Sequence, residues 1–228
     1  MKFEKTEVWG FEHSIRGLRN PLESWSKSDT VYGTYWGEID GHKCFDNDGF
    51  CIGKNDLELM QRLIKAGSEH RKFLRQIFVS VDITAPLYWW KEFDTYKVGT
   101  VANSTSTMHK LASTPITMDC FEMGDFEDCK IDMSIENFWQ SYLIPTLEQL
   151  RLKFNETKDK RYWKELIRLL PESWLQTRTV TMNYENVLNM YQQRCVHPHK
   201  LSEWSVLFKE WVESLPYARD LLFIGENK

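Results

Sequence analysis

The alternating run from Gln76 to Thr84 constrains the fold more than any other part of this sequence. Every second residue in the run is aliphatic, and most of the residues between them are polar. A period of two is the pattern of a strand that buries one of its faces. The chain therefore has to build a sheet whose apolar face is covered. The aliphatic residues are Ile77, Val79, Val81 and Ile83.

Helical patterns flank this strand. Before it, Leu57, Met60, Leu63 and Ile64 fall on one helical face, with Asn55 or Asp56 as a suitable N-cap and Gly67 as a C-terminal stop. After it, the run Thr84-Ala85-Pro86 predicts the start of a second helix. Further along the chain, apolar residues at three- and four-residue spacing predict helices near 134–155, 158–170, 183–195 and 201–214.

The remaining organisation points to one α+β domain over residues 1–228. A β-hairpin is expected between 31–36 and 43–45, around the turn Asp40-Gly41. Pro145 is expected to kink or offset the first of the later helices. No internal repeat or low-complexity linker divides the 228 residues, so a single domain is the simplest organisation.

Composition narrows the classes of function. No segment is long and apolar enough for a membrane span, and the charged N-terminus does not match a signal peptide, so we expect a soluble, cytoplasmic protein with reduced cysteines. A net charge of −4 argues against a general nucleic-acid surface. No metal site is expected, because the nearest candidate cluster, His42, Cys44 and Cys51, lacks the tight ligand pairs of structural zinc.

Catalytic motifs are equally scarce. The sequence has no Gly-x-Ser-x-Gly elbow, P-loop or Gly-x-Gly-x-x-Gly turn, so no catalytic residue is assigned. Ten tryptophans are available, and their rings either stack on a flat ligand or pack in the core, the second use being the commoner.

One spaced set of residues carries a specific signal. The set consists of Leu170-Pro171, Thr181-Met182-Asn183, Asn189 and Arg194. It resembles the C-terminal motif of the flavin-dependent thymidylate synthases, in which the same residue types occur at the same spacing. The resemblance implies that Asn183 contacts the flavin and that Asn189 and Arg194 contact the nucleotide.

The flavin motif of that family has a counterpart between Tyr96 and Met108, with several departures. Asn103 and Ser106 match, and Lys97 is a conservative replacement at a basic position. The resemblance therefore implies cofactor contact for Asn103 and substrate contact for Ser106 and Lys97. Arginines of the family are replaced at four positions, which removes charge-assisted contacts to phosphates. These positions are Tyr96, Val98, Met108 and Glu185.

The resemblance carries a full set of expectations. It implies a mostly antiparallel sheet flanked by helices, with a helical C-terminal half. It implies reductive methylation of dUMP, or of a related pyrimidine nucleotide, with FAD, NADPH and methylenetetrahydrofolate. It also implies a homotetramer, and tryptophan-rich surface would fit a subunit interface. The alternative is a non-catalytic binding or assembly protein that kept the scaffold and lost the flavin.

Overall fold

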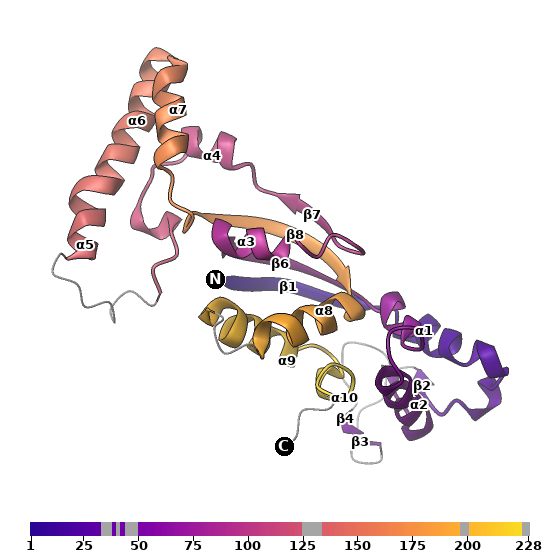
Figure 1. Cartoon of the computed structure of the whole chain (residues 1–228). Helices are drawn as coiled ribbons and strands as arrows, with labels where there is room; N and C mark the ends of the chain where they lie inside the picture. The colour runs from indigo at the N-terminus through magenta and orange to yellow at the C-terminus, as the bar shows by residue number, and fades with distance from the viewer. Residues whose placement is uncertain (33–37, 40–41, 44–49, 125–133, 197–200, 225–228) are drawn as a thin grey trace. The chain divides into compact units, whose positions relative to one another are not determined.

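The fold is built on a four-stranded antiparallel sheet flanked by helices (Figure 1), seen in a computed structural model that describes residues 1–32, 38–39, 42–43, 50–124, 134–196 and 201–224. The strand order is β1-β6-β8-β7. The α+β class and the mostly antiparallel sheet expected from the sequence are confirmed. The strands are β1 (Lys2–Trp9), β6 (Phe78–Pro86), β8 (Leu175–Asn183) and β7 (Val101–Ser104).

Strand β6 is the alternating run, and its burial follows the expected period of two. Its polar face meets β8 through paired side chains. The hydroxyls of Thr84 and Thr177 lie 2.7 Å apart, and Thr179 donates to Asp82 at 2.6 Å. Residue 84 meets residue 177 and residue 82 meets residue 179, so the two strands run antiparallel.

Strand β8 was not expected, because this part of the chain was assigned to a helical C-terminal half. Its residues lie in the middle of the sheet, between two helical segments. The first half of β8 shows only partly buried side chains, and full burial begins at Val180. Threonines and an arginine on its polar positions conceal the alternation that makes β6 easy to find.

Two compact units divide the chain, and β6 and β8 pass through both of them. One unit contains residues 1–2, 82–95 and 102–179, and the other contains 3–81, 96–101 and 180–228. The expectation of a single domain over residues 1–228 stays a prediction.

The first unit carries a helical hairpin. Figure 1 shows its two arms, α6 and α7, side by side. A π-helical turn, η6 (Trp139–Leu143), lies directly before α6, whose first turn contains Pro145, so the regular helical spacing is offset next to this proline within one uninterrupted helical run. The helices of this unit are α3 (Leu87–Phe93), α4 (Thr107–Ser113), α5 (Ile135–Phe138), α6 (Ile144–Thr157) and α7 (Lys160–Leu169), with a short 3-10 turn η4 (Met118–Cys120).

The second unit contains the C-terminal helices and the first two helices of the chain. Two further π-helical turns, η7 (Tyr191–Cys195) and η8 (Glu203–Phe208), interrupt segments expected to be regular α-helix. Its 3-10 turns are η1 (Asn20–Leu22), η2 (Trp25–Lys27) and η3 (Lys72–Gln76). Its helices are α1 (Phe11–Leu18), α2 (Lys54–Lys65), α8 (Tyr184–Met190), α9 (Lys209–Glu213) and α10 (Ala218–Leu221).

The expected hairpin is only partly confirmed. Two short antiparallel pairs are present, β3 (Glu38–Ile39) with β4 (His42–Lys43), and β2 (Val31–Tyr32) with β5 (Phe50–Cys51). Strand β2, at the start of the expected first arm of the hairpin, therefore pairs with residues 50–51 instead of 43–45. The turn at 40–41 and Cys44 lie outside the described residues. Cys51 is disulfide-bonded, so the expectation of reduced thiols is wrong there, because spacing alone does not reveal which thiols meet.

The tryptophans mainly form core. Five of the nine tryptophans in the described residues are buried (Trp89, Trp90, Trp174, Trp204 and Trp211), whereas Trp9 and Trp25 are exposed. Tryptophan content is therefore no argument by itself for a subunit interface. Among the described residues, no helix is long and apolar enough to cross a membrane.

The first turn of α2 is capped by the side chain of Asp29, a residue far from the helix in the sequence, and not by the side chain of its own N-cap residue. Gly53 occupies the N-cap position, so the expectation of Asn55 or Asp56 as N-cap is wrong. The carboxylate of Asp29 accepts from the backbone N–H groups of Asn55 and Asp56, at 2.9 and 3.1 Å. These are the orphan donors that every helix start has to satisfy.

Asp56 turns inward and anchors the segment before β2. Its carboxylate accepts from Arg19 Nε at 2.6 Å, from Ser28 Oγ at 2.7 Å and from Thr30 Oγ1 at 2.6 Å. Burial by itself would raise the pKa of Asp56, but the hydrogen bonds from Thr30, Ser28 and Arg19 outweigh it and hold the pKa below its ordinary value. Arg19 and Asp56 thus form a buried ion pair, and the Nη2 of Arg19 has no hydrogen-bond partner among the described residues.

We expect Asp56→Asn to lower the free energy of unfolding by about 3–5 kcal/mol, because it leaves Arg19 buried without its counter-charge. The ionised carboxylate stabilises the fold at neutral pH, and this contribution disappears as pH falls from about 4 through the lower folded-state pKa. Urea unfolding measured across this pH range should therefore show a flatter acid limb for the variant.

The matched control is Asp159→Asn on α7. Asp159 pairs with Arg161, whose side chain is 90% exposed, and asparagine still caps the helix. This variant should change the free energy of unfolding much less than Asp56→Asn does, because an exposed ion pair contributes little. Equal costs for the two variants would contradict the role given to Asp56.

Candidate functional site

The start of α8 is locked by two asparagines. Asn183, the N-cap residue, accepts from the backbone N–H of Asn186 at 3.0 Å, and the Asn186 side chain accepts from the Asn183 N–H at 3.2 Å. This reciprocal capping box satisfies donors at the helix start and fixes where β8 becomes α8. Asn183 therefore lies at a strand-to-helix junction, with its side-chain oxygen already engaged.

A short loop, residues 96–101, is tied to this junction. Asn186 Nδ2 donates to the Val98 carbonyl at 2.7 Å. Gly99 has a φ of +79°, and a Cβ at this position would lie 2.9 Å from Asn183 Nδ2 and 2.9 Å from Asn186 Oδ1. Only glycine fits so close an approach in this backbone conformation. The loop consequently holds Lys97, which is exposed, in the same unit as Asn183.

Two arginines surround Glu185 on the first turn of α8. Arg71 Nε donates to Glu185 Oε1 at 3.1 Å, and Arg75 forms a second ion pair with the same carboxylate. Burial alone would raise the pKa of Glu185, but the hydrogen bonds from Arg75 and Arg71 outweigh it and hold that pKa below its ordinary value. Glu185 stands where the family motif has an arginine. The positive charge missing at that position is therefore supplied by Arg71 and Arg75, from another segment.

Arg71 also orients Asn189, one of the residues assigned to the nucleotide. Its Nη2 donates to Asn189 Oδ1 at 3.0 Å. With that oxygen occupied, the amide nitrogen of Asn189 is the atom left to donate to a ligand carbonyl. The group Arg71, Arg75, Glu185 and Asn189 carries two positive charges and one negative charge, so its net charge is +1.

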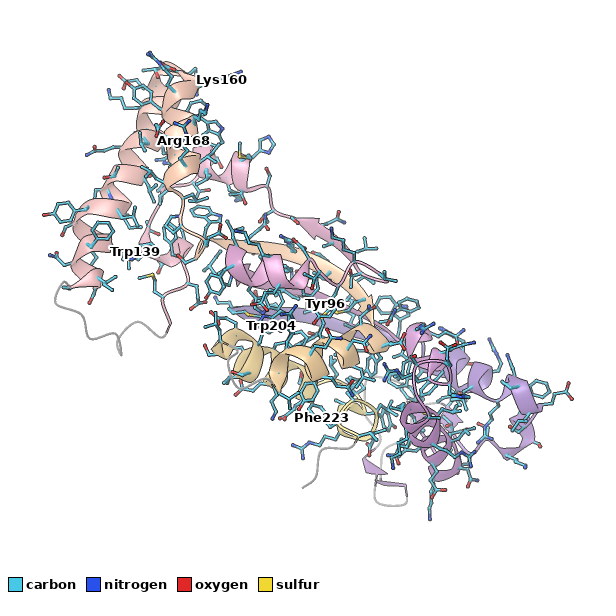
Figure 2. All side chains as sticks on the ribbon, viewed as in Figure 1. Tyr96, Trp139, Lys160, Arg168, Trp204 and Phe223 are labelled. Atoms are coloured by element: carbon cyan, nitrogen blue, oxygen red, sulfur yellow. The ribbon has the colours of Figure 1, made fainter. Side chains whose placement is uncertain are left out.

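Arg194 lies at a π-helical turn between two aromatic rings. Its Nε donates to Tyr96 Oη at 2.9 Å, and Tyr96 Oη donates to Gln193 at 3.0 Å. The guanidinium also lies 5.5 Å from the Tyr96 ring centroid and 5.9 Å from that of Trp204. Both rings are labelled in Figure 2. Such contacts hold a cation by its attraction to the ring face.

The remaining sequence-predicted residues belong to the other unit. Asn103 lies on β7 and is exposed. Ser106 is the N-cap of α4, where its hydroxyl accepts from the His109 N–H at 3.3 Å and lies 2.9 Å from His109 Nδ1. One unit, then, contains Asn183, Asn189, Arg194 and Lys97, and the other contains Asn103 and Ser106.

Sequence reasoning missed the arginines at 71 and 75 and the partners of Arg194. The two arginines are four residues apart just before β6, a spacing that puts basic side chains on one side of a helical turn. That pair was the available signal. Nothing in the sequence connected it to Glu185, which lies 114 residues from Arg71.

Comparison with known proteins supports the fold. A crystal structure of the flavin-dependent thymidylate synthase ThyX from Helicobacter pylori, complexed with FAD and dUMP, matches with a TM-score of 0.66 and 18% identity over 100% of each chain. Another structure of that organism's Thymidylate Synthase X, with FAD and dUMP, matches with a TM-score of 0.65 and 18% identity over 98% of each chain. At this identity the likeness establishes the ThyX-like fold.

The sequence itself is far from known families. No protein-family model matches the chain. No curated protein matches it either.

Arg71 and Arg75 differ in what their removal should cost. Arg71 is 15% exposed and serves both Glu185 and Asn189, whereas Arg75 is 49% exposed. We expect Arg71→Ala to lower the free energy of unfolding by about 2–3 kcal/mol, because it removes one of the two cations beside Glu185 and the donor to Asn189 Oδ1. Arg75→Ala should cost less than about 1 kcal/mol. Urea unfolding of both variants checks the order, and a reversed order would contradict the central role of Arg71.

Proposed function

We propose that this protein is a divergent homologue of the flavin-dependent thymidylate synthases that binds dUMP or a related pyrimidine nucleotide. The observation that carries the proposal is the engagement of Asn189 by Arg71 beside Glu185. The hydrogen bond from Arg71 orients the side-chain amide of Asn189 on α8, the helix that bears the family-like motif. The group of Arg71, Arg75, Glu185 and Asn189 has a net positive charge. The likeness to two structures solved with FAD and dUMP supports the same assignment.

In this proposal the nucleotide contacts within one unit come from three side chains. Asn189 donates its amide N–H to a carbonyl of the pyrimidine, and Arg194 supplies fixed donors to a carbonyl or phosphate. Lys97 adds a point charge from the exposed loop, and the role that the resemblance implies for Ser106, in the other unit, stays a prediction. The reaction would be reductive methylation, with NADPH and methylenetetrahydrofolate as co-substrates, in a homotetramer.

The residues present fit tight FAD binding poorly. Asn183 has its side-chain oxygen committed to the capping box, and Asn103 offers only an amide. Tyr96 and Val98 stand where the family motif has arginines, and Val98 is 88% exposed without any charge to offer a pyrophosphate. Reduced flavin supplies the hydride in the family reaction, so weak FAD binding would limit this protein's activity.

A second candidate is a non-catalytic binding or assembly protein on the same scaffold. Its support is that Arg194 already has a hydrogen-bond partner in Tyr96, and that Glu185 places a carboxylate on the helix start. The first feature occupies a donor of Arg194, and the second reduces the positive charge offered to a cofactor. Purified protein without yellow colour, and without a response to dUMP, would favour this candidate.

Nucleotide binding is testable by thermal shift. At a dUMP concentration of about 100 times Kd, the wild type should gain about 2.7 kcal/mol, or roughly 5–10 °C in Tm for a chain of this size. Asn189→Ala and Arg194→Ala should abolish the gain by removing the proposed donors. Gln192→Ala, an exposed neighbour, is the matched control and should keep it.

The outcomes separate the hypotheses. A dUMP shift that persists in both variants would place the nucleotide elsewhere on the protein. A wild type that does not respond would contradict the nucleotide assignment itself.

FAD affinity can be tested by restoring a charge. Each lost charge-assisted hydrogen bond is worth about 1.5–3 kcal/mol, so two losses weaken Kd about a hundredfold or more. We expect little FAD in the purified protein, and we expect Val98→Arg to tighten FAD binding by at least about tenfold. Flavin absorbance in an equilibrium titration measures both.

Val101→Arg is the matched control for this gain of affinity. Val101 is the first residue of β7, directly after this loop, and is 69% exposed, but it is not a position where the family motif has an arginine. If both arginine variants tighten FAD equally, the effect is general charge attraction. Stoichiometric FAD in the wild type would show that other residues have taken over the phosphate contacts.

A further inference from the structure

The unit that contains residues 3–81 has a pocket whose lining residues play no part in the proposed nucleotide site. It lies between the end of α1, the face of α2 and the turn η3, and its volume is about 620 Å³. Small-molecule sites typically have volumes of roughly 300–1,000 Å³. Its size therefore admits an organic ligand rather than a single ion or water.

The pocket combines an apolar lining with cations. Leu18, Leu59, Leu63 and Phe73 supply apolar surface from three different elements. A body of carbon atoms placed against these side chains gains by leaving water. The exposed Leu22, on η1, extends this lining at the surface.

Two cationic side chains line the same pocket. They are Arg62, in the last turn of α2, and Lys72, at the first position of η3. In the part of the chain that the structure describes, neither side chain forms an ion pair or a hydrogen bond. A third lining residue, Glu69, carries the one negative charge among the lining residues, so the formal charge at neutral pH is +1 with His70 neutral.

We propose that this pocket binds an amphipathic anion, a small molecule with an apolar body and a carboxylate or phosphate group. Arg62 and Lys72 would hold the anionic group by charge-assisted hydrogen bonds. The leucines and Phe73 would cover the body. Arg71, between His70 and Lys72, faces Glu185 instead, so the two sites use alternate residues of one segment.

The test uses isothermal titration calorimetry with two probes, 1-naphthyl phosphate and decanoate. They carry phosphate on a flat body and carboxylate on an acyl chain, so their relative affinities identify the preferred class. We expect saturable binding of at least one probe. Inorganic phosphate alone, which has no apolar body, should bind at least about tenfold more weakly.

Charge reversal at the pocket decides whether the site is correct. Arg62→Glu and Lys72→Glu should each weaken the binding probe by at least about tenfold, since repulsion replaces attraction. Lys54→Glu, an exposed residue at the other end of α2 that does not line the pocket, should leave Kd within about twofold. All three residues are exposed, and unchanged melting curves would confirm that the variants fold.

Two results would overturn the proposal. One is that neither probe gives saturable binding to the wild type. The other is that Arg62→Glu and Lys72→Glu bind the probe as tightly as Lys54→Glu does. Both readouts are independent of dUMP, so they stand apart from the outcome of the nucleotide experiment.

Discussion

The reciprocal amide hydrogen bonds between Asn183 and Asn186 fix the point at which a strand becomes a helix, and the candidate site depends on that point. The next residue, Tyr184, donates its backbone N–H to the Ile77 carbonyl at 2.9 Å, which ties the junction to the end of η3. Glu185 is thereby held opposite Arg71. Shifting the junction by one residue would move every side chain on α8 to another face, and the polar network would not form.

The network of Arg71, Arg75, Glu185 and Asn189 has a net positive charge, although the residue types that supply the charge differ from those of the family-like motif. A carboxylate stands where the family-like motif leads one to expect an arginine, yet two arginines from before β6 surround it. The net charge of the group is positive, but its cations come from the 3-10 turn η3 and the residue that caps it. An anionic ligand placed there would meet Arg75, which is half exposed, before it met the buried Arg71.

The sequence was informative where one physical effect dominated. Strand β6 was found because one face is wholly aliphatic, and the helices were found because their apolar spacing is regular. Strand β8 was missed because threonine and arginine on its polar positions mask its period. The cap of α2 and the partners of Glu185 were missed for a different reason. Both rely on contacts between residues far apart in the chain, such as Asp29 with Asp56 and Arg71 with Glu185, and local pattern carries no trace of them.

The π-helical turn that holds Arg194 has an evolutionary consequence. Such a turn closes its hydrogen bonds over five residues instead of four, so it accommodates one more residue than an α-helical turn. Each residue of an α-helix rotates the chain by about 100°. Loss of a single codon within Tyr191–Cys195 would therefore swing Arg194 away from Tyr96, with every side chain of α8 unaltered. A one-residue deletion or insertion before Arg194 would therefore change which groups its guanidinium meets without any substitution.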